Sequence, residues 1–437
     1  MNLQAPEALP PSYRPRRLVL QPLPVYVAAG TVPISNSEPD PWPITHPTKE
    51  FAYEMKTYWG KPWAKVTVFG DARLSREVPV FLENGFITGS VQLNLKNKEA
   101  IKGVYLVVNG DVVTSEDLLP KRVNFLKLRH YVWRRSREQL EVDNTIVGEH
   151  TWQFSVRIPQ STDDSVVGAD QYRLPHPVVE RYSKIGVDYY LEFHVHRGGK
   201  LRADDSLGIQ FGYFTMQQPK GLSLPRLLAG QTNRTIPGPF EDPEGWKALE
   251  PVIITGKTFG MREVKVKCTI FLAKPLCYTR GTAIPCCATF ECADEQTLDL
   301  FAAMNSSLLY LERQVTCFVD GTSKQVSPCG KTSWRPYPYM SQNTLTGRHL
   351  MGELHLHKGL YPSTRVKQFR VDYEVVLFPP DAVVTFVPNT FAPLLTARVE
   401  IVTRYAAGVR QSKQPSIPEY SSELRSPPID RYYRSLS

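Results

Sequence analysis

The chain has no long hydrophobic run and few cysteines, and both absences narrow what it can be. No apolar stretch reaches the roughly 18 residues that a membrane-spanning helix needs, and residues 18–29 are interrupted by Pro22 and Pro24, which argues against a signal peptide. The seven cysteines all lie between Cys268 and Cys329, without a Cys-x-x-Cys pair. This usage favours reduced, mostly buried thiols over a disulfide framework. We therefore expect a cytosolic protein.

The motifs of the common enzyme classes are also missing. The sequence contains no Gly-x-Ser-x-Gly elbow, phosphate-cradling glycine loop, His-Glu-x-x-His motif or dinucleotide fingerprint. A zinc site built from Cys286, Cys287 and Cys292 is disfavoured, because neighbouring residues on a strand point to opposite faces. The expectation is a protein without catalytic activity, cofactor or bound metal.

Two pairs of histidines keep a metal-dependent enzyme open as an alternative. In each pair one residue separates the imidazoles, which places both on one face of a strand, a spacing that metal sites use. The pairs are His194 with His196 and His355 with His357. Two acids, Asp188 and Glu192, share the face of the first pair. The simpler interpretation is that all of these residues fill polar positions on an exposed sheet face.

Positive charge exceeds negative charge only modestly and is concentrated in one place. The 52 Lys and Arg residues are interleaved with 43 Asp and Glu, giving a net charge of +9, and nucleic-acid binding usually needs a denser patch. A run at 121–137 has no acid. Its cations are Lys121, Arg122, Lys127, Arg129, Arg134, Arg135 and Arg137. One interpretation of the run is a site that binds anionic lipid headgroups or a phosphorylated tail. The other is a solvated edge strand or loop whose charge resists aggregation.

Hydrophobic alternation predicts an all-β protein. Val91, Leu93 and Leu95 alternate with polar residues, and similar segments recur in both halves of the chain. Asn109-Gly110 is expected to close a hairpin after a strand that begins at Ile101. The one convincing helical pattern is 294–306. Short strands at this spacing are typical of immunoglobulin-like β-sandwiches, of which we expect two in tandem.

Proline-rich segments delimit these predicted domains. Residues 1–50 hold eleven prolines, which predicts a disordered arm, and a second proline-rich stretch lies in the middle of the chain. The predicted organisation is an arm at 1–50, an amino-terminal sandwich at 51–216, a linker at 217–260, a carboxyl-terminal sandwich at 261–405 and a disordered, proline-containing tail at 406–437.

The arm carries a Pro-Pro-x-Tyr motif formed by Pro10, Pro11 and Tyr13. Proline favours the polyproline II geometry that the aromatic groove of a WW domain binds, so the motif needs little ordering to dock. An incidental tyrosine in a proline-rich linker is the alternative interpretation. Two degenerate versions that lack the first proline end at Tyr26 and Tyr420.

Several strings resemble, in order, those of the fungal arrestin-like (α-arrestin) family. Gly89-Ser90-Val91-Gln92-Leu93 is similar to its early "G-x-V-x-L" strand, and 101–110 to the strand and turn that follow. Residues 148–159 look like its aromatic "F-S-F-x-L-P" strand. Residues 277–285 look like the opening of its carboxyl-terminal arrestin domain, where a strand turns at Arg-Gly and resumes. The resemblance covers roughly residues 60–405.

This resemblance implies two arrestin-type domains and a trafficking adaptor. Family members hold a HECT-type ubiquitin ligase through Pro-Pro-x-Tyr motifs and bring it to membrane transporters or receptors for endocytosis. The implied partners are therefore a WW-domain ligase and membrane-protein cargo, with recruitment to the plasma membrane or endosomes, and the basic run adds an expected contact with an anionic membrane. The motif lies at the amino-terminal end here, whereas the family more often carries it after the second domain. A ligase-independent, retromer-cargo-like trafficking scaffold is the alternative.

Overall fold

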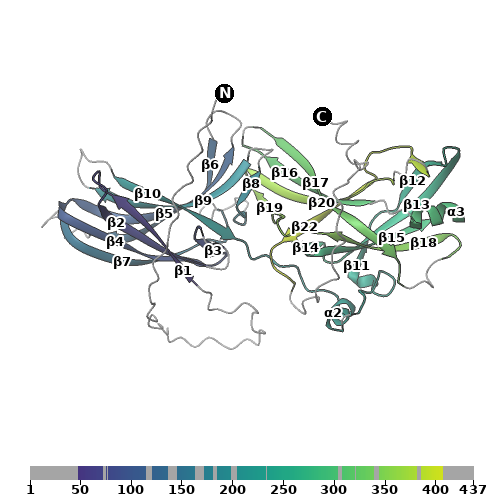
Figure 1. Cartoon of the computed structure of the whole chain (residues 1–437), viewed down its shortest axis with the longest axis horizontal. Helices are drawn as coiled ribbons and strands as arrows, with labels where there is room; N and C mark the ends of the chain where they lie inside the picture. The colour runs from purple at the N-terminus through teal and green to yellow at the C-terminus, as the bar shows by residue number, and fades with distance from the viewer. Residues whose placement is uncertain are drawn as a thin grey trace, which may run out of the picture. The chain divides into compact units, whose positions relative to one another are not determined.

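The computed structural model describes most of the chain between Thr48 and Ala406 (Figure 1). The described ranges are 48–71, 75, 77–114, 121–135, 145–162, 172–180, 185–197, 204–232, 234–303, 308–319, 321–338, 344–380 and 385–406. Nearly all regular structure in these ranges is β-strand, so the predicted all-β class is confirmed. Neither α-helix of the described chain is long and apolar enough to cross a bilayer.

The first two sheets come from residues 48–214. The first sheet has four antiparallel strands, in the order β1 (Thr48–Lys56), β2 (Pro62–Asp71), β4 (Phe86–Glu99) and β7 (Ile146–Arg157). The second sheet has the order β3 (Val80–Leu82), β10 (Asp205–Phe214), β9 (Ile185–Arg197), β5 (Ile101–Thr114) and β6 (Lys121–Arg134), with β8 (Val178–Glu180) also paired to β9. β3 runs parallel to β10, and the other pairs are antiparallel.

Alternation decides which faces of these two sheets are buried. On β4, Val91 and Leu93 are buried while Gln92 and Asn94 are exposed, as the period of two requires. The inward faces of both sheets belong to one buried cluster. Trp133 of β6 stacks on Trp152 of β7 with ring centroids 5.6 Å apart, which joins the two layers at one edge. The two sheets form a β-sandwich.

The sequence expectation of a hairpin at Asn109-Gly110 is wrong. β5 continues through this dipeptide to Thr114, and the pairing with β6 shifts register between Gly110 and Asp111, as at a β-bulge. A Cβ atom on Gly110 would lie 2.6 Å from the ring of Phe125. The glycine therefore serves close packing against β6 and not a turn.

The third sheet is built from residues 246–402 and has twelve strands. Its main path has the order β14 (Cys277–Thr279), β22 (Leu395–Val402), β20 (Phe369–Leu377), β16 (Leu309–Cys317), β17 (Ser323–Pro336), β18 (Gly347–His355), β15 (Ala283–Glu291), β13 (Arg262–Ala273), β12 (Val252–Thr258) and β21 (Phe386–Pro388). β11 (Trp246–Ala248) pairs with β13, and β19 (Thr364–Val366) pairs with β20.

One long strand lets this sheet fold into two layers. The first part of β17 pairs with β16 from Ser323 to Lys331, and its last part, Thr332 to Pro336, pairs with β18. The pairing shifts register between Leu311 and Glu312, as at a β-bulge, and Cys329 of β17 is the residue left without an opposed partner. Strands that bend in this way and belong to two layers form the corners of sandwiches.

Two α-helices and one short 3₁₀ helix accompany the strands in the described chain. α3 (Glu295–Ala303) lies within the helix predicted at 294–306, and Asp294 accepts a hydrogen bond from the backbone N–H of Thr297 at its start. α2 (Leu224–Gln231) was not expected from the sequence, because Pro225 and the short apolar pattern conceal it. The predicted linker 217–260 holds α2, η1 (Pro243–Gly245), β11 and β12.

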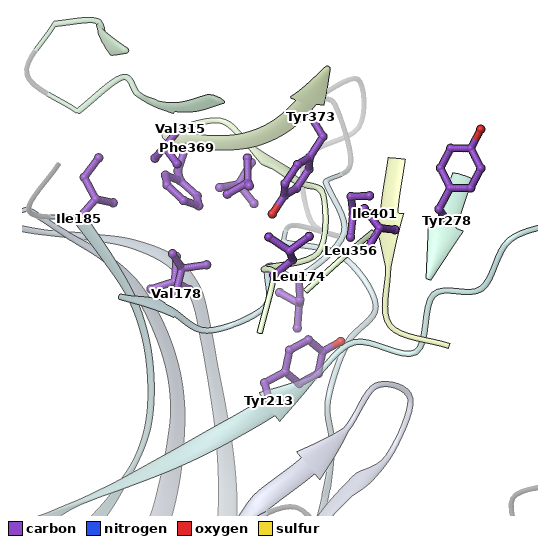
Figure 2. Packing of buried hydrophobic residues seen from close by; sticks show 14 of the residues in the cluster. Leu174, Val178, Ile185, Tyr213, Tyr278, Val315, Leu356, Phe369, Tyr373 and Ile401 are labelled. Carbon is purple, nitrogen blue, oxygen red and sulfur yellow. The ribbon is translucent and has the colours of Figure 1, made fainter. Parts of the chain in front are cut away.

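No described strand from 48–214 pairs with one from 246–402. The buried cluster nevertheless contains residues from both stretches. Figure 2 shows Leu174, Val178 and Ile185 near Phe369 and Tyr373. Just after the last strand of each stretch, the backbone N–H of Arg404 donates a hydrogen bond to the carbonyl of Gln217 at 2.8 Å. The predicted division into two domains stays a prediction.

Candidate functional site

The basic run lies on β6, which is the edge strand of the second sheet. Among the described strands, β6 pairs with β5 alone. Five of its predicted site residues are exposed: Lys121, Arg122, Lys127, Arg129 and Arg134. Arg135 follows the strand and is buried, with 6% of its surface accessible, and Arg137 lies outside the described residues. The run thus lies on an edge strand, and both of its predicted roles, resistance to aggregation and anion binding, stay predictions.

Aromatic side chains contact two of the cations in the second half of β6. The guanidinium of Arg129 lies 4.8 Å from the ring centroid of Tyr105 on β5. Tyr105 stacks in turn on His194 of β9, at 4.8 Å, and contacts Tyr131 at 5.5 Å. The guanidinium of Arg134 lies 5.3 Å from the ring of Tyr131. We call these five residues the Arg–Tyr cluster. Its cation–π contacts hold the guanidinium groups at the surface in defined positions.

The register explains why these residues share a face. Tyr131 on β6 lies opposite Tyr105 on β5, and Tyr105 lies opposite His194 on β9. Directly opposed residues in antiparallel strands point to the same side of a sheet. Burial raises the pKa of Tyr105, and the positive charge of Arg129 acts in the opposite direction.

Among the described residues, carboxylates form ion pairs with the exposed arginines of β6 only near the beginning of the strand. Arg122 lies 3.6 Å from Asp111 and 3.5 Å from Asp188. Asp111 also accepts a hydrogen bond from the hydroxyl of Tyr190, and burial together with this bond raises the pKa of Tyr190 to about 12. By contrast, Lys127, Arg129 and Arg134 form no ion pair with any carboxylate of the described chain. These three cations can therefore receive an external anion.

Arg135 closes the edge of the sandwich. Its guanidinium lies 5.8 Å from the ring of Trp133. Trp133 stacks on Trp152, which stacks on His150 at 5.4 Å. This arrangement is typical of packing, with Arg135 lying against the aromatic side chains that join the edge strands of the two sheets.

The predicted WW-binding residues Pro10, Pro11 and Tyr13 lie outside the described residues. The motif therefore stays a prediction from the sequence.

The paired histidines have separate partners. His194 Nε2 lies 3.1 Å from the carboxylate of Glu192, and His196 Nδ1 lies 2.8 Å from that of Asp204. His357 Nδ1 accepts a hydrogen bond from the backbone N–H of Gly359, while His355 ends β18. Within the described residues, no three His, Cys, Asp or Glu side chains converge as a metal site would require.

All seven cysteines are free, and four of them are buried. Cys286 and Cys287 belong to two different buried clusters, as expected for strand neighbours on opposite faces. Burial raises the pKa of Cys287 to about 12, and burial together with the charge of Glu400 raises that of Cys277 to about 12. Such thiols carry little thiolate at neutral pH, so they are poor nucleophiles.

A cavity of about 510 Å³ lies among residues of both chain stretches. Arg173, Arg365 and Arg398 line it, but carboxylates accompany each of them. Arg173 donates two hydrogen bonds to buried Glu83, at 2.5 and 2.6 Å. The internal charge pairing makes this cavity less suited to an anion than the face of β6.

The sequence identified the cations of β6 but not their aromatic partners on other strands. Tyr131 and Trp133 lie within the run, whereas Tyr105 and His194 are distant in sequence. Only the strand register brings the latter two to the cluster.

Comparison with models of known protein families found no match, and comparison with curated protein sequences found none either.

Proposed function

We propose that this protein is an arrestin-like trafficking adaptor. It recruits a WW-domain HECT-type ubiquitin ligase through Pro10, Pro11 and Tyr13 and presents it to a membrane transporter or receptor for ubiquitination and endocytosis. The face of β6 binds an anionic group, on the membrane or on a phosphorylated cargo tail. The protein itself has no catalytic role in this proposal, and it acts at the plasma membrane or endosomes.

The observation that carries the proposal is a group of exposed cations on β6, the edge strand of the second sheet. Lys127, Arg129 and Arg134 have no carboxylate partner in the described chain. Two of them are already positioned by tyrosine rings, so less side-chain freedom is lost when an anion binds. An all-β sandwich with such an edge can serve as a rigid surface for binding a partner.

The ligase would act by proximity. A WW domain held on a tether near the sandwich stays at a high local concentration relative to bound cargo, so its encounter with the cargo becomes intramolecular. The proposal therefore needs two separable contacts, one in the arm and one on β6.

The first contact is tested by Tyr13→Ala in the full chain. Loss of the ring that fills the WW groove should abolish capture by an immobilised WW domain. Tyr26→Ala is the matched control, since Tyr26 belongs to a degenerate motif, and it should bind like the parent chain. Equal capture of parent and Tyr13→Ala proteins would contradict ligase recruitment and favour the ligase-independent scaffold.

The second contact is tested by the double variant Arg129→Glu with Arg134→Glu. Binding to vesicles that contain phosphatidylserine, or to a phosphorylated cargo peptide, should fall by about tenfold or more and lose much of its salt dependence. The control variant Lys247→Glu with Lys367→Glu changes the net charge equally at exposed sites outside β6. If both variants bind equally weakly, only overall charge matters and the β6 site is wrong.

A further inference from the structure

The most exposed aromatic side chains of the described chain lie together at the tip of the β1–β2 hairpin. Tyr58 is 95% exposed and Trp59 is 84% exposed. Their rings contact each other edge to face, with centroids 5.3 Å apart. Large rings are usually at least partly covered in a folded protein, so an exposed pair at one tip indicates a contact surface.

The tip is held firmly by its own backbone. The N–H of Thr57 donates to the carbonyl of Lys61 at 2.8 Å, and the N–H of Gly60 donates back to the carbonyl of Thr57 at 2.9 Å. Gly60 has φ +76°, which a glycine adopts without strain. The two rings are therefore presented by a closed turn.

The base of the hairpin is anchored to the end of the sandwich. The guanidinium of Arg197 lies 5.2 Å from the ring of Trp63, the first tryptophan after the tip. The Arg197 side chain is 7% exposed and pairs with Glu99 at 2.6 Å and Asp205 at 2.7 Å. This buried group joins β2 to the ends of β4, β9 and β10, so the rings project from a rigid base.

The same end of the sandwich carries lysines. Ala64 of β2 pairs with Leu93 of β4, so the tip lies beyond this point, toward the β4–β5 connection. The exposed lysines of the tip and the connection that contribute here are Lys61, Lys96 and Lys102, whereas Lys56 pairs with Glu54 at 3.8 Å. Arg197 already engages Glu99 and Asp205. The positive charge that remains at this end favours an anionic partner.

From these observations we propose that the β1–β2 tip inserts Tyr58 and Trp59 into the headgroup region of an anionic lipid bilayer. Tyrosine and tryptophan prefer this region because it solvates both the apolar ring and its polar group. Nearby lysines add attraction to anionic lipids. A stable protein interface needs about 800 Å² on each partner, far more than two rings at a narrow tip provide, whereas a bilayer accepts such a protrusion.

A second exposed tip offers a matched control. Phe259 is 63% exposed and Met261 is 88% exposed at the β12–β13 hairpin. Its charges are balanced, because Arg262 pairs with Asp294 at 2.7 Å and Lys257 lies opposite Glu263 in the register. The two tips thus share exposed apolar side chains but differ in surrounding charge.

The test uses the full chain and vesicles of phosphatidylcholine with or without phosphatidylserine. The double variant Tyr58→Ala with Trp59→Ala should lower partitioning onto phosphatidylserine vesicles by about tenfold. The control variant Phe259→Ala with Met261→Ala should partition like the parent chain. Trp59→Phe should retain most of the binding, because phenylalanine keeps an apolar ring at the tip.

Insertion has a spectroscopic readout as well. Lipids brominated on the acyl chain near the headgroup should quench tryptophan fluorescence of the bound parent chain, and this quenching should largely disappear in Trp59→Phe. Parent-like partitioning of the tip variant, an equal loss in the control, or absence of quenching would each overturn the proposal. Capture by a WW domain should be unchanged in the tip variant, so failure of tip insertion is distinguishable from failure of ligase recruitment.

Discussion

At the scale of single residues, His176 is a buried group whose ionisation the fold opposes. Its Nδ1 atom is buried without a hydrogen-bond partner in the described chain. Its ring contacts that of Phe214 edge to face, with centroids 5.5 Å apart. The guanidinium of Arg280 lies 5.3 Å from the centroid of the same Phe214 ring. Burial, and secondarily the charge of Arg280, lowers the pKa of His176 to about 3. The neutral imidazole is therefore the form that the folded protein accepts.

This depressed pKa predicts a loss of stability in acid. Between about pH 6.5 and pH 3 the unfolded chain binds a proton that folded His176 does not, so the free energy of unfolding falls as the pH falls through this window. His176→Phe should remove that part of the pH dependence, worth on the order of a few kcal/mol over the full window. Urea unfolding of both proteins at pH 7 and pH 5 measures the difference.

If His176→Phe destabilises the protein equally at both pH values, the residue contributes packing only and the ionisation argument is wrong.

At the scale of elements, Gly89 shows how closely the strands of the first sheet pack. A Cβ atom at this position would collide with the backbone oxygen of Thr67 and lie 2.6 Å from the ring of Phe154. Both neighbours belong to adjacent strands, β2 and β7. The glycine thus allows an aromatic ring to lie over the strand.

Gly89→Ala should therefore lower the free energy of unfolding by about 1–3 kcal/mol through overpacking. Gly208→Ala is the matched control, because Gly208 is a strand glycine with no heavy atom within 4 Å of its added Cβ. It should be neutral or stabilise by up to about 1 kcal/mol, since alanine restricts the unfolded chain. Denaturant titration of both variants measures the contrast, and similar values would contradict the packing argument.

The elements also show what the sequence could predict. The spacing of apolar residues can be seen within a short segment of sequence. The strands that contain Val91 and Phe369 were predicted from alternating apolar residues, and the helix near Leu298 from apolar residues one turn apart. The bulge at Gly110 depends on Phe125 of another strand, and the same dipeptide pattern is typical of hairpins. The cations of the candidate site were likewise predicted from one run, whereas Tyr105 and His194 join it only through register.

At the scale of the whole described chain, the buried cluster connects residues that no strand pairing connects. Leu174 is 1% exposed and lies near Tyr213 and Tyr373 in Figure 2. Side-chain packing provides this connection, together with the hydrogen bond from the backbone N–H of Arg404 to the carbonyl of Gln217. Local alternation carries no information about such contacts, so the sequence could not predict them.

Leu174→Ala should loosen both chain stretches. Loss of a buried leucine costs about 2–5 kcal/mol, and part of that loss should appear as faster hydrogen exchange in β20 as well as in β9. Leu93→Ala, a control within the first sandwich, should speed exchange chiefly in residues 48–214. Unchanged exchange in β20 after Leu174→Ala would contradict energetic coupling through the cluster.

The corner strand β17 makes the third sheet intolerant of changes in length. Residues Ser323 to Lys331 set the pairing of one layer and Thr332 to Pro336 that of the other. Because side chains alternate between faces, deleting one residue near Lys331 would invert the inside and outside of whatever follows it. Evolution can therefore vary the side chains of this strand, but insertions and deletions should accumulate in the turns at its two ends.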